Sequence, residues 1–159
     1  MSADAGAPTK TVLVVDDDLP LRALCRASLE EAGFRVLEAA DGEQALASVR
    51  DELPDLILLD IMMPGISGWE VTSALLADRS TDQIPIVFMS ARTEVADRMR
   101  AFDLGAQDYV MKPFDPHALA KTVAKTLDEI DRGERDAALA ETLAALRKEQ
   151  ITVDKPPSS

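Results

Sequence analysis

The chain has 159 residues, enough for one domain of ordinary size with a buried core. Hydrophobic residues make up 47% of it and charged residues 29%, a composition that excludes a disordered or fibrous protein. The 29 acidic residues outnumber the 17 basic ones and give a net charge of −12 without a basic cluster, so we expect protein partners and no nucleic acid. No apolar stretch reaches the ~20 residues that span a bilayer, and the N-terminus lacks a signal pattern, so we expect a cytoplasmic protein with no membrane partner.

The first part of the chain predicts a leader, a strand and a helix. Residues 1–9 are small, polar and aperiodic, which is typical of a disordered segment. The apolar run Thr11–Val15 ends in three consecutive aspartates, 16–18, and this indicates a buried strand that delivers carboxylates to its end. Residues 19–32 carry apolar side chains at helical spacing, and Gly33 is expected to end that helix.

Two more strands and a helix follow. Residues 34–38 are typical of a strand. The spacing in Asp41–Gln44 is that of a capping box, which opens a helix that residues 53–54 close. Leu56–Leu59 then supplies four apolar residues in a row, followed directly by Asp60 and by Pro and Gly turn chemistry. We therefore expect a fully buried strand that holds Asp60 at its end.

The remaining part repeats the alternation of helix and strand. A further capping box opens the next helix, and a proline at the first helical position opens the last one of this series. We expect the helices at 67–75, 93–104 and 116–130 and the strands at 84–89 and 109–111.

Five predicted strands thus alternate with five helices, and nearly all the strands are continuous apolar runs. Strands of this kind are buried on both faces, which is typical of a parallel sheet covered by helices on both sides. With right-handed crossovers, the sequence predicts a doubly wound α/β fold, (βα)5, with its functional site at the carboxyl ends of the strands.

Polar side chains of complementary charge follow four of these strands. Asp16 and Asp17 come after the first, Asp60 after the third, Ser90 after the fourth and Lys112 after the fifth. Because the carboxyl ends of parallel strands meet at one edge, we expect one site there. Clustered carboxylates repel one another unless a cation lies among them, and oxygen ligands suit Mg²⁺, with Mn²⁺ as an alternative.

Such a site suits phosphoryl chemistry. A metal ion held by few protein ligands keeps waters and can contact a phosphoryl oxygen. Lys112 would add a positive charge and Ser90 a hydrogen-bond donor. The carboxylate of Asp60 can then act as a nucleophile and form an aspartyl phosphate.

Four motifs, in their order along the chain, resemble the response-regulator receiver domain of two-component signalling, in particular the single-domain type found in chemotaxis. The likeness covers about residues 10–130, and it implies the strand order 2-1-3-4-5. We expect residues 10–131 to form the domain. The motifs are Val14–Asp18, Leu59–Gly65, Ser90–Ala91 and Asp108–Phe114.

The resemblance also implies roles at the site. Asp60 would accept phosphate from a histidine kinase or a histidine phosphotransfer protein. Asp17, Asp60 and the backbone carbonyl of Met62 would bind Mg²⁺ directly, and Asp16 would do so through water. The bond between Lys112 and the proline after it resembles the cis-proline junction of the family.

A switch follows from the same resemblance. Ser90 and Lys112 would contact the phosphoryl group, and movement of Ser90 would let Tyr109 turn inward. The surface of the fourth helix, fifth strand and fifth helix would change, and a downstream protein would bind there. Met62 and Arg92 flank the pocket and are expected to tune the lifetime of the phosphate.

Beyond this domain, Gly133 interrupts the helical register. Residues 132–151 predict a short amphipathic helical extension. Two roles stay open for it: packing back on its own domain, or serving as a dimerisation or partner-docking helix. Residues 152–159 are expected to be a disordered tail. The leucine stripe of the extension consists of Leu139, Leu143 and Leu146.

Three other functions fit parts of the pattern. A Mg²⁺-dependent aspartyl phosphohydrolase generally needs a second carboxylate soon after the nucleophile, whereas Ile61–Met63 follows Asp60. A nucleotide or flavin carrier would need a Gly/Ser/Thr-rich cradle where Asp16–Asp18 would repel phosphate. The composition of the tail also fits a third alternative, a receiver that belongs to a larger regulator or hybrid kinase. We expect no external substrate and no enzyme activity beyond self-phosphorylation and autodephosphorylation.

Overall fold

A five-stranded parallel sheet lies at the centre of the computed structural model, which describes residues 9–92 and 94–154. Its strand order is β2-β1-β3-β4-β5. The predicted doubly wound (βα)5 fold and its strand order are therefore confirmed. The strands are β1 (Thr11–Val15), β2 (Arg35–Ala39), β3 (Leu56–Asp60), β4 (Ile86–Ser90) and β5 (Asp108–Met111).

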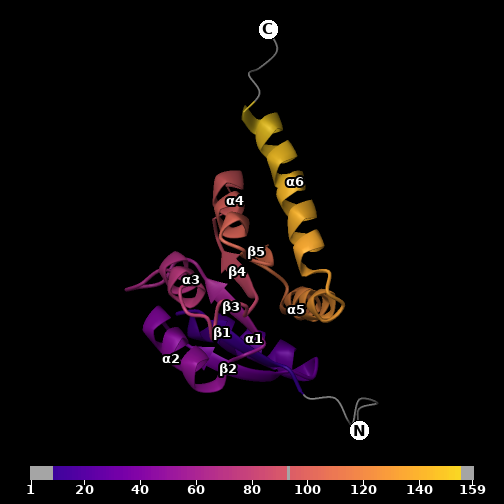
Figure 1. Cartoon of the computed structure of the whole chain (residues 1–159). Helices are drawn as coiled ribbons and strands as arrows, with labels where there is room; N and C mark the ends of the chain where they lie inside the picture. Colours follow the sequence, from indigo (N-terminus) through magenta and orange to yellow (C-terminus); the bar gives the residue numbers. More distant parts are fainter. Residues whose placement is uncertain (1–8, 93, 155–159) are drawn as a thin grey trace.

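Helices cover both faces of the sheet (Figure 1). One face packs against α1 and α5, and the opposite face packs against α2, α3 and α4. A sixth helix, α6, follows α5 and lies beside α4 (Figure 1). The helices are α1 (Leu19–Glu31), α2 (Gly42–Glu52), α3 (Gly68–Leu76), α4 (Val95–Asp103), α5 (Pro116–Asp131) and α6 (Arg135–Asp154).

Alternate residues of each central strand enter two separate apolar clusters. Leu13 and Ile57 belong to the cluster under α2, α3 and α4, whereas Val12 and Leu58 belong to the one under α1 and α5. Because both faces are covered, every residue of β3 and β4 is buried. This burial on both faces is the physical reason why the central strands are continuous apolar runs in the sequence.

Most element boundaries agree with the sequence to within one or two residues. The Asp18 side chain caps α1 by accepting from the Leu21 amide, and Ser67 and Glu70 form the complete capping box at α3. The strand predicted at 84–89 runs instead from residue 86 to 90. Pro85 has no amide hydrogen to donate, so the ladder begins after it, although its carbonyl accepts from Ile57.

The extension differs more from the sequence prediction. α6 begins at Arg135 and runs to Asp154, so residues 152–154 belong to the helix and not to the predicted tail. Gly133 separates α5 from α6 with a φ of +74°, a left-handed conformation that favours glycine. Residues 1–8 and 155–159, most of the predicted leader and tail, lie outside the described residues. Among the described helices, none is both long and apolar enough to cross a bilayer.

Candidate functional site

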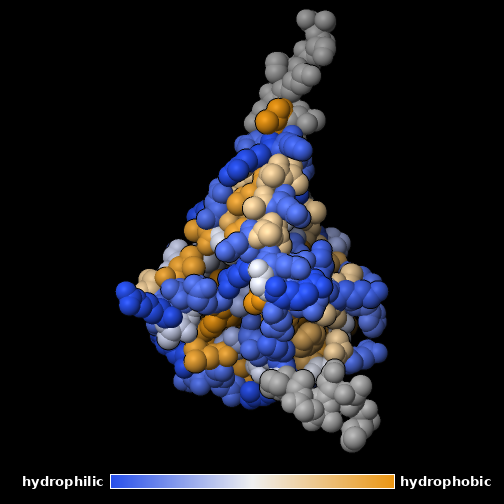
Figure 2. All heavy atoms as spheres, turned by 45° about the vertical axis from the view of Figure 1, so that its right-hand side comes forward, coloured by the Kyte–Doolittle hydropathy of each residue, from blue (hydrophilic) through white to orange (hydrophobic). Residues whose placement is uncertain are grey.

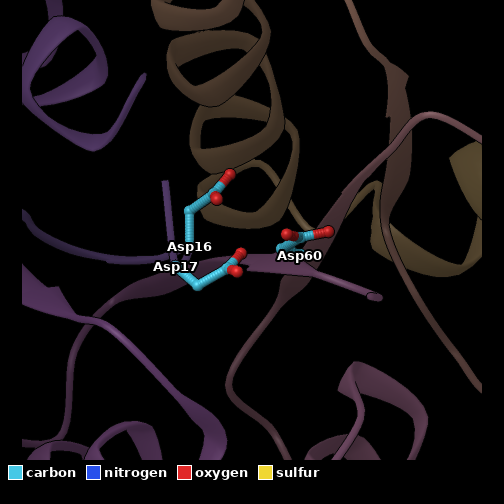
Figure 3. Close-up of side chains that lie close together, drawn as sticks. All are labelled: Asp16, Asp17 and Asp60. Atoms are coloured by element: carbon cyan, nitrogen blue, oxygen red, sulfur yellow. The ribbon is translucent and has the colours of Figure 1, made fainter. Parts of the chain in front are cut away.

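Three aspartates meet at the carboxyl edge of the sheet (Figure 3). Asp16 and Asp17 follow β1, and Asp60 ends the neighbouring strand β3. One carboxylate oxygen from each lies within 4.8 Å of those from the other two. Asp16 and Asp60 are buried, whereas Asp17 is exposed. Three carboxylates at this spacing, one of them open to solvent, fit a hard divalent cation such as Mg²⁺.

Backbone amides hold the two buried carboxylates in place. The Met62 amide donates to Oδ1 of Asp60 at 3.1 Å, and the Asp18 amide donates to Oδ1 of Asp16 at 2.9 Å. Arg22 on α1 donates to the Asp16 carbonyl at 2.7 Å. In each of these carboxylates, Oδ1 thus accepts a hydrogen bond from the backbone amide two residues further along the chain.

Gly68 lets α3 begin directly against the backbone of Asp60. Its amide donates to the Ile61 carbonyl at 2.9 Å. A Cβ at this position would lie 2.6 Å from the Asp60 carbonyl oxygen and 2.8 Å from the Cα of Ile61, so any other residue forces backbone atoms apart. The sequence showed Gly68 only as part of a capping box, because the close approach is a tertiary contact.

Lys112 reaches the same site from the end of β5. Its ammonium lies 2.7 Å from Oδ2 of Asp16 and 3.3 Å from Oδ2 of Asp60. Burial lowers the pKa of Lys112, but the two carboxylates outweigh burial and the pKa is raised, so the side chain stays charged. The peptide bond to Pro113 is cis, as the family resemblance implies.

The pKa of Asp60 is raised to about 6. Burial is the largest cause and the negative charge of Asp16 adds to it, while Lys112 and the Met62 amide oppose the rise. Near neutral pH, a proton and a cation therefore compete for this carboxylate.

Arg92 links the remaining predicted residues. Its amide donates to Oγ of the fully buried Ser90 at 3.1 Å, and its carbonyl accepts from the Tyr109 hydroxyl at 2.7 Å. Its guanidinium pairs with Asp97 in the first turn of α4 at 3.0 Å. The Tyr109 side chain points inward here and is 8% exposed, and burial is the largest cause that raises its pKa.

A groove of about 420 Å³ adjoins Asp60 between the loops that follow β3 and β4. Beside it, Trp69 lies 5.1 Å from Phe88 between ring centroids, and the Arg100 guanidinium lies 4.3 Å from the centre of the Trp69 ring. The sequence carried no signal for this Arg100 contact. The lining residues are Ile61, Met62, Met63, Pro64, Ser67, Trp69 and Arg92, which include both positions expected to tune phosphate lifetime.

The structure thus brings Asp16, Asp17, Asp60 and Lys112 into one cluster. Ser90 forms a second group with its partners on β5 and in the loop before α4. His117, the only histidine of the chain, is exposed in the first turn of α5.

A family model described as the response regulator receiver domain matches residues 12–124 of the chain. The chain is 41% identical over 128 residues to the phosphate regulon transcriptional regulatory protein PhoB of Pseudomonas aeruginosa, which covers 80% of this chain and 56% of that protein. It is 42% identical over 118 residues to the probable transcriptional regulator ycf27 of Cyanophora paradoxa, which covers 74% and 48%. The chain spans about half the length of these curated relatives.

Solved structures show the same fold. The chemotaxis response regulator CheY4 of Vibrio cholerae is 31% identical with a TM-score of 0.71, over 75% of this chain and 99% of that one. The BeF3-activated DrrB receiver domain is 28% identical with a TM-score of 0.68, over 76% and 99%. The family match, the sequence identity and the shared fold agree: the chain belongs to the response regulator receiver domain family.

Proposed function

We propose that the chain is a phospho-accepting receiver of a two-component or phosphorelay system, with Asp60 as the acceptor. The arrangement around Asp60 carries the proposal: it is a buried carboxylate with two more carboxylates within 4.8 Å and the Lys112 ammonium at 3.3 Å. The donor is a phosphohistidine of a histidine kinase or a histidine phosphotransfer protein. An Asp60 oxygen attacks phosphorus, the P–N bond breaks, and the imidazole leaves with the electron pair and takes up a proton.

Mg²⁺ is the cofactor that suits this site, with Mn²⁺ as the alternative. Asp17, Asp60 and the Met62 carbonyl are assigned as direct ligands, and Asp16 as a ligand through water. When bound, the ion offsets the repulsion among the carboxylates and the phosphoryl oxygens. The donor set supports this assignment, since the side chains that could hold a cation here, among the described residues, are the carboxylates of Asp16, Asp17 and Asp60.

Lys112 and Ser90 are the groups assigned to the transferred phosphoryl oxygens. Lys112 is already charged, and its contact with Asp16 holds it at the edge of the site. It can therefore donate hydrogen bonds to the phosphoryl oxygens without first moving in from solvent. The Ser90 hydroxyl accepts from the Arg92 amide but still has its own hydrogen to donate. If the Ser90 hydroxyl donated to a phosphoryl group on Asp60, the turn from Ser90 to Arg92 would shift. Because Arg92 also contacts Tyr109 and α4, both would be affected.

The α4–β5–α5 surface is therefore the face we assign to a downstream protein, in a cytoplasmic signalling pathway. The alternative occupant of this face is a second copy of the chain, which would form a homodimer. Met62 is 57% exposed, and Arg92 forms an ion pair with Asp97. Both residues line the groove beside Asp60, where they can control the approach of a hydrolytic water.

The phosphohydrolase alternative finds less support. The residue after Asp60 is the buried Ile61, and the next is the exposed Met62, so no carboxylate stands close after Asp60 to serve as general acid. The site is built to accept and hold a phosphoryl group, and catalysis is limited to the protein's own phosphorylation and dephosphorylation.

Intact mass spectrometry after incubation with acetyl phosphate and Mg²⁺ tests the proposal. We expect one phosphoryl adduct on the parent chain, and none on Asp60→Asn or in excess EDTA. Asp55→Asn is the matched control, since this carboxylate lies at the opposite edge of the sheet and binds the Thr11 amide at 2.7 Å. An adduct that survives Asp60→Asn, or forms equally well in EDTA, would overturn the assignment.

A further inference from the structure

α6 covers part of the face assigned to the downstream protein. It packs along α4 (Figure 1), and Leu146 is only 5% exposed. Leu146 joins the apolar cluster that contains Phe102 of α4 and Tyr109 of β5. Leu139 and Leu143, on the same stripe, are partly buried against this cluster. The three leucines thus form the inner side of α6.

Polar contacts hold α6 at both ends of this stripe. Near its start, Arg135 donates to the Gln107 side chain and, at 2.6 Å, to the Gln83 carbonyl. One turn beyond Leu146, Glu149 pairs with Arg98 of α4 at 2.7 Å. The Arg98 side chain is 17% exposed, so this pair is partly withdrawn from water.

Other features indicate that the contact can open. α6 joins the domain through the exposed Gly133 turn, and its contact with α5 is slight compared with that to α4. Nε of Arg98 is buried and finds no hydrogen-bond partner among the described residues, so undocking would return it to water. Figure 2 shows the projecting part of α6 as a surface on which hydrophilic and apolar residues are mixed, and Ile151 near its end is 69% exposed.

We propose that the α4–β5 face is a helix-docking surface and that α6 is its intramolecular occupant, which competes with helical partners. A partner that fits has leucines at the spacing i, i+4, i+7 and a carboxylate three residues further on, opposite Arg98. Because α6 is tethered by a short turn, its effective concentration at the face is on the order of millimolar, so a weak contact keeps the face closed. The inference rests on the proposed function only for the role of this face in signalling.

A trans-binding experiment tests this competition. The full-length variant Leu143→Asp/Leu146→Asp should release α6, which amide hydrogen exchange of α4 and α6 reports directly. A fluorescein-labelled peptide of residues 134–154 should then bind this variant at least tenfold more tightly than it binds the parent chain, by fluorescence anisotropy. Adding Arg98→Glu to the released variant should weaken binding, and a peptide with Glu149→Arg should restore it.

Two results would overturn the proposal. One is a released variant, with fast exchange in α6, that does not bind the peptide. The other is a parent dimer in light scattering whose cross-links join α6 of one copy to α4 of the other, since the occupant would then act between chains. Formation of the Asp60 adduct in the released variant shows that its domain is folded. Peptide binding is measured separately from this adduct, so a failure of the phosphate chemistry is distinguishable from a failure of the docking proposal. If that variant unfolds, Glu149→Arg alone should still speed exchange in α6, and unchanged exchange would contradict the proposal.

Discussion

Lys112 donates a hydrogen bond to Asp16 at 2.7 Å across the carboxyl edge of the sheet, although two strands lie between β5 and β1. Asp60 ends one of these intervening strands and lies 3.3 Å from the same ammonium. The lysine therefore offsets two buried negative charges that the fold brings together.

Replacing Lys112 with Met should leave both carboxylates without their cation. We expect a loss of about 2–3 kcal/mol in the free energy of unfolding at pH 7.5 in EDTA, since an unpaired buried charge is costly. Urea unfolding measures this loss. Lys125→Met is the control, because Lys125 is exposed and its pair with Glu129 is 3.8 Å long. Equal stability of the two variants would show that the Lys112 pairs are weak.

Asp60→Asn should stabilise the protein above pH 6. The folded pKa of Asp60, about 6, lies above its ordinary value of 3.8. The group therefore contributes stability that is present below about pH 4 and is lost as pH rises through about 6. In EDTA we expect the free energy of unfolding of Asp60→Asn to exceed that of the parent by about 3 kcal/mol at pH 7.5 and by little at pH 4. Urea unfolding across this pH range measures the difference, and the exposed Asp17→Asn serves as control. A constant difference across the range would contradict the pKa shift.

Mg²⁺ should bind more weakly in acid for the same reason. Protonation of Asp60 removes a ligand, so we expect the apparent Kd for Mg²⁺ to rise about tenfold between pH 7.5 and pH 5. Isothermal titration calorimetry measures the affinity directly. Asp60→Asn should bind weakly at both pH values, and a pH dependence as large as that of the parent would assign the proton to another group.

Gly68→Ala should distort the site through the backbone. The added Cβ would lie 2.6 Å from the Asp60 carbonyl oxygen, and neither backbone can move without shifting β3 or α3. We expect a loss of about 2 kcal/mol or more in the free energy of unfolding and slower formation of the Asp60 adduct. Gly133→Ala is a suitable comparison. Its φ is +74°, but apart from its two chain neighbours no heavy atom of the described residues lies within 4 Å of the place that its Cβ would occupy, so its adduct formation should be unchanged.

Local patterns in the sequence account for the fold and for the main cluster. The run Leu56–Leu59 had to be buried on both faces, and parallel strands bring their carboxyl ends to one edge, so Asp16 and Asp60 could be expected to meet. Caps such as Ser67 with Glu70 marked the helix starts. These signals are contained within single elements, which is why one sequence suffices to find them.

The parts that could not be predicted depend on contacts between distant elements. The leucine stripe of α6 indicated an apolar face but not the surface that would cover it, because many helix faces can accept the same spacing. The Arg98–Glu149 pair joins residues 51 positions apart. The inward position of Tyr109 likewise depends on the carbonyl of Arg92, which no pattern in the strand reveals.

Tyr109→Phe should separate packing of the ring from its hydrogen bond. The variant keeps the ring in the apolar cluster but removes the hydroxyl that donates to the Arg92 carbonyl at 2.7 Å in the parent. We expect a loss of about 1 kcal/mol in the free energy of unfolding, whereas Tyr109→Ala should lose about 3–5 kcal/mol because it also leaves a cavity. If Arg92 transmits changes from Ser90 to α4, Tyr109→Phe should also speed amide exchange in α4 while the yield of the Asp60 adduct stays close to that of the parent. Unchanged exchange in α4 would show that the hydroxyl contributes to stability without coupling the site to this helix.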